Sequence, residues 1–135
     1  MGDYDTPNIN IGSGLNVQYL VSEYATIGNK CALITPNENR TANNCFFGQN
    51  GIRDVAGKTL KFTCNVKATT NYTVAILEYN AGWKTVKYIN CTSSTTSPEL
   101  ICTISEESIV IWPRLSFPRD TTEKLYTDNW ILNIL

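Results

Sequence analysis

The sequence predicts an all-β fold, a β-sandwich or barrel, and two observations lead to this prediction. Short segments in which apolar and polar residues alternate recur at intervals of roughly 8 to 12 residues and are separated by turn-forming residues. No segment has a convincing amphipathic helical pattern, although a helix stays open between Asn16 and Ala25. Many short strands without helices are typical of two-layer antiparallel folds.

The clearest strand lies within Ile52–Ala68. A Gly-Lys turn at Gly57 opens it, and polar residues then alternate with apolar ones at Leu60, Phe62, Cys64 and Val66. Such a strand buries one face and exposes the other, so it must pair within a sheet that has one solvated face.

Further strands are expected on both sides of this segment. We expect them at Ile9–Ile11, Leu15–Tyr19, Cys31–Thr35, Cys45–Phe47, Tyr72–Tyr79, Trp83–Ile89, Leu100–Ile104, Ile109–Leu115 and Lys124–Leu135. In the strand that starts at Ile109, alternation places Ile109, Ile111 and Leu115 toward the core. Trp112 and Arg114 then lie on the opposite face, and Pro113 predicts a sheet edge or a bulge.

Length and charge restrict the partners. The 135 residues suit one domain, residues 1–135, that buries a core without metal or disulfide staples. The formal net charge is −1 and no basic stripe is present, which argues against a nucleic-acid partner. No apolar run approaches the roughly 20 residues that cross a bilayer, and no signal peptide is visible at the polar start.

Catalysis is restricted by the absence of histidine. Ser-His-Asp and Cys-His mechanisms and histidine-rich zinc sites are excluded, whereas a pair of carboxylates remains possible. The carboxylates considered are Asp54, Glu78, Glu106, Glu107, Asp120, Glu123 and Asp128. None lies in a motif that identifies a general acid and a nucleophile, and adjacent Glu106 and Glu107 suit a solvated turn. We therefore expect that the chain is not an enzyme.

The five cysteines form no CxxC pair and are odd in number, which argues against zinc knuckles and against a complete disulfide framework. Cys64 and Cys102 lie at apolar phases of their strands and are expected to fill the core as free thiols. One or two bridges among the five stay open if the compartment is oxidising.

Two motifs resemble a known group of proteins. Asp54-Val-Ala-Gly-Lys-Thr-Leu-Lys-Phe-Thr-Cys-Asn-Val-Lys-Ala68 resembles a strand of the jelly-roll carbohydrate-binding modules of the galactose-binding-domain-like group. Lys124-Leu-Tyr-Thr-Asp-Asn-Trp-Ile-Leu132 resembles the closing strand of the same group, which binds xylans, glucans and other glycans. The resemblance covers the chain from Ile52 onward and implies a jelly-roll β-sandwich of two antiparallel sheets.

A glycan-binding surface needs aromatic rings for the apolar faces of sugars and polar groups for their hydroxyls. The candidate ligand-binding residues are Trp83, Trp112, Tyr79, Tyr88 and Arg114. For each ring the alternative is a packing role, and for Arg114 the alternative is a surface ion pair, which is the more frequent role of such a residue. Trp130 is expected in the core because it is in phase with Leu132 and Ile134.

The resemblance also implies a structural calcium ion, held in part by the acidic residue of the closing strand, which is Asp128 here. A hard cation of this kind requires several oxygen ligands. No clear acidic partner lies on the first strand, which leaves Asp3, Asp5, Asn8, Asn10 and backbone carbonyls near Gly28 and Lys30. An Asp that only accepts hydrogen bonds from nearby backbone is the alternative.

Two functions follow as hypotheses. The first is non-catalytic binding of a polysaccharide or glycan on a sandwich face. The second is a structural or attachment module of a phage tail, virion or cell-surface adhesin, which mediates protein assembly or host recognition beside neighbouring domains. Both would place the chain outside the cell, on a cell surface or on a virion.

Overall fold

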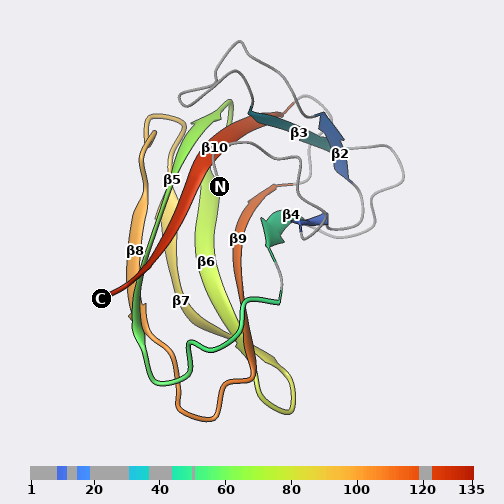
Figure 1. The fold of residues 1–135 in the computed structure, drawn as a ribbon. Coiled ribbons are helices and arrows are strands. Elements are labelled where there is room, and N and C mark those ends of the chain that lie inside the picture. Colours follow the sequence, from blue (N-terminus) through green and yellow to red (C-terminus); the bar gives the residue numbers. More distant parts are fainter. Residues whose placement is uncertain (1–8, 12–14, 19–30, 37–43, 50, 119–122) are drawn as a thin grey trace.

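The computed structural model describes residues 9–11, 15–18, 31–36, 44–49, 51–118 and 123–135. This part of the chain forms ten strands in two antiparallel sheets, which pack against each other as a β-sandwich (Figure 1). The strands are β1 (Ile9–Ile11), β2 (Leu15–Gln18), β3 (Ala32–Pro36), β4 (Asn44–Gln49), β5 (Thr59–Ala68), β6 (Tyr72–Tyr79), β7 (Trp83–Cys91), β8 (Glu99–Thr103), β9 (Val110–Pro118) and β10 (Leu125–Ile134). The predicted all-β sandwich is therefore confirmed.

The two sheets are built from strands that alternate along the chain. Sheet A has the order β1-β4-β9-β6-β7, and sheet B has the order β2-β3-β10-β5-β8. From β4 onward the chain passes repeatedly between the sheets, because β5, β8 and β10 belong to sheet B while β4, β6, β7 and β9 belong to sheet A. The inward faces of both sheets thus share one core.

β5 is the half-buried strand that the sequence predicts. Its inward residues, Leu60, Phe62, Cys64 and Val66, are buried, while the residues between them are partly exposed. It lies inside sheet B between β10 and β8.

Trp130 joins the two layers of the core. It is buried, and its ring meets Phe47 of sheet A and Phe62 of sheet B edge-to-face, with centroids 5.5 and 5.3 Å apart. Its indole N–H donates to the Thr127 hydroxyl at 2.8 Å, so the polar edge of the ring is satisfied inside the core. The prediction that Trp130 belongs to the core is confirmed.

A bulge in β10 turns Asp128 and Trp130 to opposite sides. The register between β10 and β5 shifts between Asp128 and Ile131, and Asn129 has a left-handed φ of 53°. Asp128 pairs with Asn65, which lies between two inward residues of β5, so Asp128 faces away from the core. Strict alternation would instead have put Asp128 on the same face as Trp130.

The strand around Pro113 differs in part from prediction. β9 is an interior strand of sheet A, so the expected edge is not present, and its pairing with β6 has no register shift. On the β4 side, however, the register shifts by one residue between the pairs Gly48–Arg114 and Ile52–Ile111, so an irregularity of the predicted kind does lie at Pro113. Ile111 exchanges both backbone hydrogen bonds with Ile52 on the β4 side, and alternation turns Pro113 to that side too. The β4–β9 ladder ends at the pair Gly48 and Arg114, so the missing N–H of Pro113 falls where the ladder is interrupted.

The start of β9 also requires a correction. Ile109 was expected to face the core, but it precedes the strand and is 50% exposed, whereas Ile111 and Leu115 are fully buried. The Ile109 N–H donates to the carbonyl of Tyr79 at 2.9 Å. Backbone pairing thus holds Ile109 in the turn, outside the core.

The first third of the chain supplies strands on one side of both sheets. β1 is an edge strand of sheet A, as predicted, and β2 pairs with β3 in sheet B. Residues 16–18, where a helix stayed open, belong to β2, and residues 19–25 lie outside the described residues. Among the described residues, no helix is long and apolar enough to cross a membrane.

In the described part of the chain, Cys64, Cys91 and Cys102 are buried thiols outside any disulfide bond, and Cys31 is buried as well. Burial raises the pKa of the Cys64 and Cys102 thiols, because the thiolate loses its hydration inside the core. The prediction that Cys64 and Cys102 fill the core is confirmed.

Candidate functional site

The outer face of sheet A presents side chains in rows that cross β9, β6 and β7. Residues directly opposite each other in antiparallel strands share a face, so the register fixes each row. The rows are Val110 with Tyr79 and Trp83; Trp112 with Leu77 and Thr85; Arg114 with Ala75 and Tyr88; and Ser116 with Thr73 and Asn90. The five predicted ligand-binding residues all stand in the first three of these rows, and no carboxylate stands in any of them.

Three aromatic rings form a continuous series on this face. Tyr79 meets Trp83 with ring centroids 5.3 Å apart, and Trp83 meets Trp112 at 5.8 Å, both in edge-to-face geometry. Trp83 is 41% exposed and Tyr79 37% exposed, so the series lies at the surface. Tyr88 is more exposed and stands apart from the series in the Arg114 row, across the small side chain of Ala75.

Arg114 extends the series on the far side of Trp112. Its guanidinium carbon lies 4.8 Å from the centroid of the Trp112 ring, which is a cation–π contact. Burial lowers the pKa of the Arg114 guanidinium below its ordinary value, because the charged form loses hydration. Arg114 and Trp112 face away from the buried Ile111 and Leu115, as the alternation in this strand predicts.

The Trp112 ring can lie against the sheet because the facing residue of β4, Gly48, has no side chain. Gly48 pairs with Arg114, and a Cβ on Gly48 would lie only 2.3 Å from the indole nitrogen of Trp112. This nitrogen is buried and has no hydrogen-bond partner in the described part of the chain. The ring therefore occupies space that any other residue at position 48 would fill.

A groove opens at the Trp83 end of this face. It has a volume of about 360 Å³ and is lined by Gly51, Arg53, Tyr79, Trp83 and Val110. Three segments meet there, namely the β4–β5 connection, the β6–β7 hairpin and the start of β9, at the lower end of the sandwich in Figure 1. The lining of the groove thus combines two aromatic residues with one arginine.

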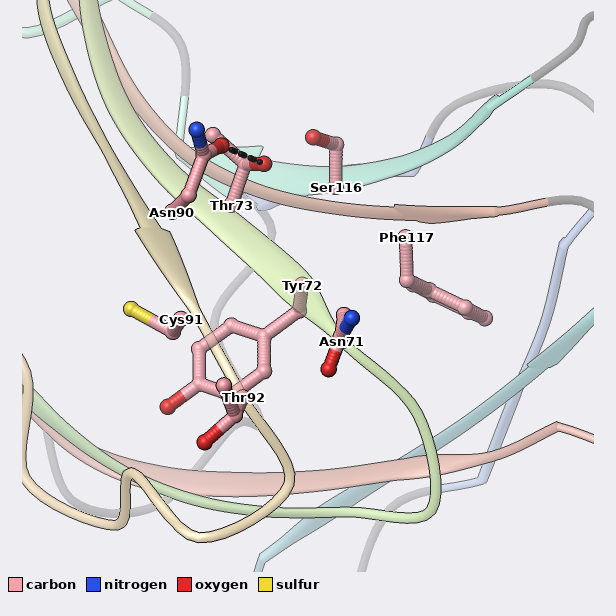
Figure 2. A pocket seen from close by; sticks show the side chains of 8 residues that line it. All are labelled: Asn71, Tyr72, Thr73, Asn90, Cys91, Thr92, Ser116 and Phe117. Atoms are coloured by element: carbon pink, nitrogen blue, oxygen red, sulfur yellow. Dashed lines mark hydrogen bonds between the residues drawn. The ribbon is translucent and has the colours of Figure 1, made fainter.

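A second, polar pocket of about 310 Å³ lies at the other end of these strands, where β6 begins and β7 ends (Figure 2). It is lined by Asn71, Tyr72, Thr73, Asn90, Cys91, Thr92, Ser116 and Phe117. The Thr73 hydroxyl donates to Asn90 Oδ1 at 3.1 Å. Figure 2 shows that the Tyr72 ring points away from this hydrogen-bonded pair. Amides and hydroxyls therefore continue the outer face beyond Arg114.

Asp128 lies beside a third cavity, on sheet B. It is 1% exposed, and the cavity of about 290 Å³ is lined by Asn65, Val66, Lys67, Thr96, Ser97, Tyr126, Thr127 and Asp128. The Ser97 hydroxyl donates to Asn65 Oδ1 at 3.3 Å, and the Thr127 hydroxyl donates to the Asn65 carbonyl at 2.8 Å. Oxygen atoms of the kind that hard cations prefer thus gather around a buried carboxylate.

Most of the residues expected to share a calcium ion with Asp128 cannot be placed. Asp3, Asp5, Asn8, Gly28 and Lys30 lie outside the described residues. Asn10 belongs to β1 and pairs with Gly48 in sheet A, whereas Asp128 is in sheet B. No group of three or more His, Cys, Asp or Glu side chains among the described residues could hold a metal, so the calcium site stays a prediction.

The carboxylates of the chain serve other purposes or lie apart. Glu78 is buried and accepts hydrogen bonds from the Ser105 N–H at 3.0 Å and its hydroxyl at 2.8 Å, with Lys84 Nζ at 3.2 Å. Glu106 and Glu107 are exposed in the β8–β9 turn. Asp120 lies outside the described residues. None of the three cavities described above is lined by two carboxylates.

The sequence did not single out several residues of this surface. Arg53, Gly51 and Val110 line the groove, and Thr73, Asn90 and Ser116 form the polar row. The polar row could have been found, because each member is in phase with a predicted ligand-binding residue of its own strand, namely Tyr79, Tyr88 or Arg114. Arg53 could not, because it lies in an irregular segment whose path depends on the tertiary fold.

The chain resembles known proteins in structure but not in sequence. No family model matches it, and no curated protein matches it in sequence. Solved structures do match. The CBM22-1 xylan-binding domain of Xyn10C from Paenibacillus barcinonensis has a TM-score of 0.67 and 12% identity, over 98% of this chain and 91% of that chain. The chain has the jelly-roll fold of the carbohydrate-binding modules.

Two larger proteins contain a similar unit. The CBM22-1-GH10 modules of endo-1,4-beta-D-xylanase 10B from Clostridium thermocellum, in complex with xylohexaose, match with a TM-score of 0.72 and 10% identity over 99% of this chain. The enzymatically active domain of tailspike protein 4 from bacteriophage CBA120 matches with a TM-score of 0.68 and 12% identity over 96% of this chain. This chain spans 27% of the xylanase chain and 20% of the tailspike chain. At these identities the likeness shows the fold alone.

Proposed function

We propose that the chain binds carbohydrate without converting it, and that the outer face of sheet A is the binding surface. The observation that carries this proposal is the series of rings formed by Tyr79 and Trp83, which are exposed, and by Trp112, which is partly exposed. Such rings cover the apolar C–H faces of sugars, while nearby amides, hydroxyls and guanidinium groups bond to sugar hydroxyls. The polar row and Arg114 supply groups of these kinds on the same face.

These rings are not required to complete the core. The core has its own aromatic centre in Trp130, Phe47 and Phe62. Trp83 and Tyr79 instead remain more than a third exposed and lie beside the groove. An apolar surface that is maintained beside a groove is typical of a binding site.

The shape of the face suits a chain of several sugars. The residues of β9 that take part run from Val110 to Ser116, and a strand of this length spans roughly 20 Å. The groove lies at one end of this span and the polar pocket at the other. We therefore propose a polysaccharide or a longer glycan as the partner, met outside the cell, on a cell surface or on a virion.

A non-catalytic role is supported by the chemistry of the face. The chain has no histidine, and its outer face on sheet A carries no carboxylate in the four rows. The solved structures that it resembles are mostly carbohydrate-binding modules, although a cyclase from Fischerella sp. TAU and the tailspike domain are also among them. The residues of this face are therefore suited to binding a sugar and not to hydrolysing it.

We also propose that Asp128 helps hold one structural calcium ion. A buried carboxylate beside the oxygens of Asn65, Ser97 and Thr127 fits a hard cation, which takes several oxygen ligands. Such an ion would stabilise the fold and has no part in contacting sugar.

The test is a glycan-array screen of the purified chain, with and without calcium, together with the variants Trp83→Ala and Trp112→Ala. We expect a specific hit that either variant weakens while its circular dichroism and unfolding midpoint stay near those of the original chain. Ile131→Ala, which removes a partly exposed apolar side chain from β10, is the control and should bind normally. Silence across diverse glycans from a folded chain would refute the proposal.

The likeness to a phage tailspike domain favours a second candidate, an attachment module that assembles with other protein chains. In that role the rings would be buried between subunits rather than against sugar. Sedimentation separates the two: a stable oligomer at low concentration that Trp83→Ala dissociates favours assembly, and a monomer favours glycan binding.

A further inference from the structure

The face proposed to bind carbohydrate is positively charged, although the chain as a whole has a net charge of −1. Arg53 is one of the residues that line the groove, and Arg114 is the one charged residue in the four rows beside it. Neither the groove nor the rows contain a carboxylate. The charge of this face is therefore a local property and does not follow from composition.

The side chain of Arg53 is available to bind a ligand. It is exposed, and within the described part of the chain its side chain makes no ion pair or hydrogen bond. Asp54, the next residue in the chain, is exposed but does not line the groove, and two other carboxylates make contacts elsewhere. Glu78 is held by Ser105 and Lys84, and Glu106 lies against Gly57, where its Cγ would be 3.4 Å from an added Cβ.

Arg53 lines the same groove as the aromatic residues Tyr79 and Trp83. A guanidinium offers its N–H donors in a planar fork that matches a carboxylate, and such charge-assisted bonds are stronger than neutral ones. Trp83, in the same groove, offers a flat surface for the C–H face of a pyranose ring. A uronic acid carries both features, because its carboxylate is fixed on the ring that stacks.

We infer that this face selects acidic glycans, with Arg53 recognising the acid group and Trp83 the sugar ring that bears it. The inference rests on the proposed function and narrows it to a class of ligand. A sulfate ester offers the same anionic oxygens as a uronate, so the experiment includes both.

The experiment uses a glycan array that holds neutral, uronate-containing and sulfated forms of several sugar backbones, followed by calorimetry on the best-bound backbone. The intact chain should bind at least one acidic form roughly tenfold more tightly than the neutral form. High salt should reduce this preference, because the pair is at the surface. Whether the uronate or the sulfate is preferred identifies the source of the charge.

Three variants test whether Arg53 causes the preference for acidic glycans. Arg53→Gln should weaken binding of the acidic form roughly tenfold, and Arg53→Lys should keep part of it because the charge remains without the fork. Lys58→Gln removes an exposed cation from the same segment outside the groove, and it should leave the preference unchanged.

Two outcomes would overturn the inference and can be told apart. If neutral and acidic forms bind equally while Trp83→Ala abolishes both, the acidic preference is wrong and the proposed function stands. If the folded chain binds no glycan in any form, the proposed function fails and the inference fails with it.

Discussion

The indole nitrogen of Trp112 lies so close over Gly48 that no side chain fits beneath it. A Cβ on Gly48 would be 2.3 Å from this nitrogen and 2.4 Å from the carbonyl oxygen of Pro113. The carbonyl belongs to the backbone of β9 and cannot move aside without disturbing the sheet. Glycine at position 48 therefore allows β4 to pair with β9 while the Trp112 ring stays on the outer face.

Gly48→Ala should destabilise the chain by about 1–3 kcal/mol, the range for inserting a methyl group into a well-packed site. It should also weaken glycan binding, because Trp112 must shift away from Trp83. Urea unfolding measures the first effect and calorimetry the second. In the double variant with Trp112→Ala the stability losses should be less than additive, because the indole obstructs the new methyl. Full additivity, or an unchanged unfolding midpoint, would contradict this account.

Glu78 should make stability depend on pH. Burial raises the pKa of its carboxyl, but the hydrogen bonds from Ser105 and the nearby Lys84 outweigh burial and hold the pKa below its ordinary value near 4.5. Because the folded pKa is the lower one, the contribution is fully present above the unfolded pKa. It is lost as pH falls through the folded pKa.

Glu78→Gln should therefore cost about 1.5–3 kcal/mol at pH 7, typical of hydrogen bonds to a charged group, and less as the solution becomes acidic. The measurement is urea unfolding of both proteins at pH 7 and at several values below 4. Glu99→Gln removes an exposed carboxylate paired with Lys61 and should change stability by under about 1 kcal/mol. A gap between Glu78→Gln and the original chain that stays constant with pH would show that the charge is not involved.

Alternation alone determined much of the fold. It placed Leu60, Phe62, Cys64 and Val66 inward on β5, and it separated Trp112 and Arg114 from Leu115 on β9. The pattern works there because each strand is regular and has one buried face. It fails where a single residue breaks the period, as at Asn129, whose bulge turns Asp128 away from the core.

The site was predictable in part for the same reason. Tyr79, Trp83 and Trp112 lie in predicted strands, and the alternation assigned Trp112 to the face opposite the core. Their contact, and the placing of Arg53 beside Trp83, depend on which strands become neighbours. Strand order is set by the packing of the whole sandwich, and no local pattern records it.

The buried thiols should resist modification. Burial raises the pKa of Cys64 and Cys102, which lowers the fraction of reactive thiolate at pH 8. We expect iodoacetamide to leave both unlabelled in the native chain and to label both in urea, as peptide mass spectrometry would show. Thr63→Cys, on the outer face next to Cys64 in β5, should be labelled readily without urea. Labelling of Cys64 in that native variant at the same rate as the introduced thiol would contradict the prediction, because it would mean that the core opens often.

Calcium dependence tests the remaining role, that of Asp128. If its carboxylate is a ligand, calcium should raise the unfolding temperature and EDTA should lower it, with about 2.7 kcal/mol of stabilisation at a hundredfold excess over Kd. Loss of stability in Asp128→Asn is not itself informative, because removing a buried charge disturbs the fold whether or not a metal is bound. The informative quantity is the calcium response, which should vanish in Asp128→Asn and persist in Glu99→Gln. An original chain that ignores both calcium and EDTA would mean that protein groups alone hold this carboxylate.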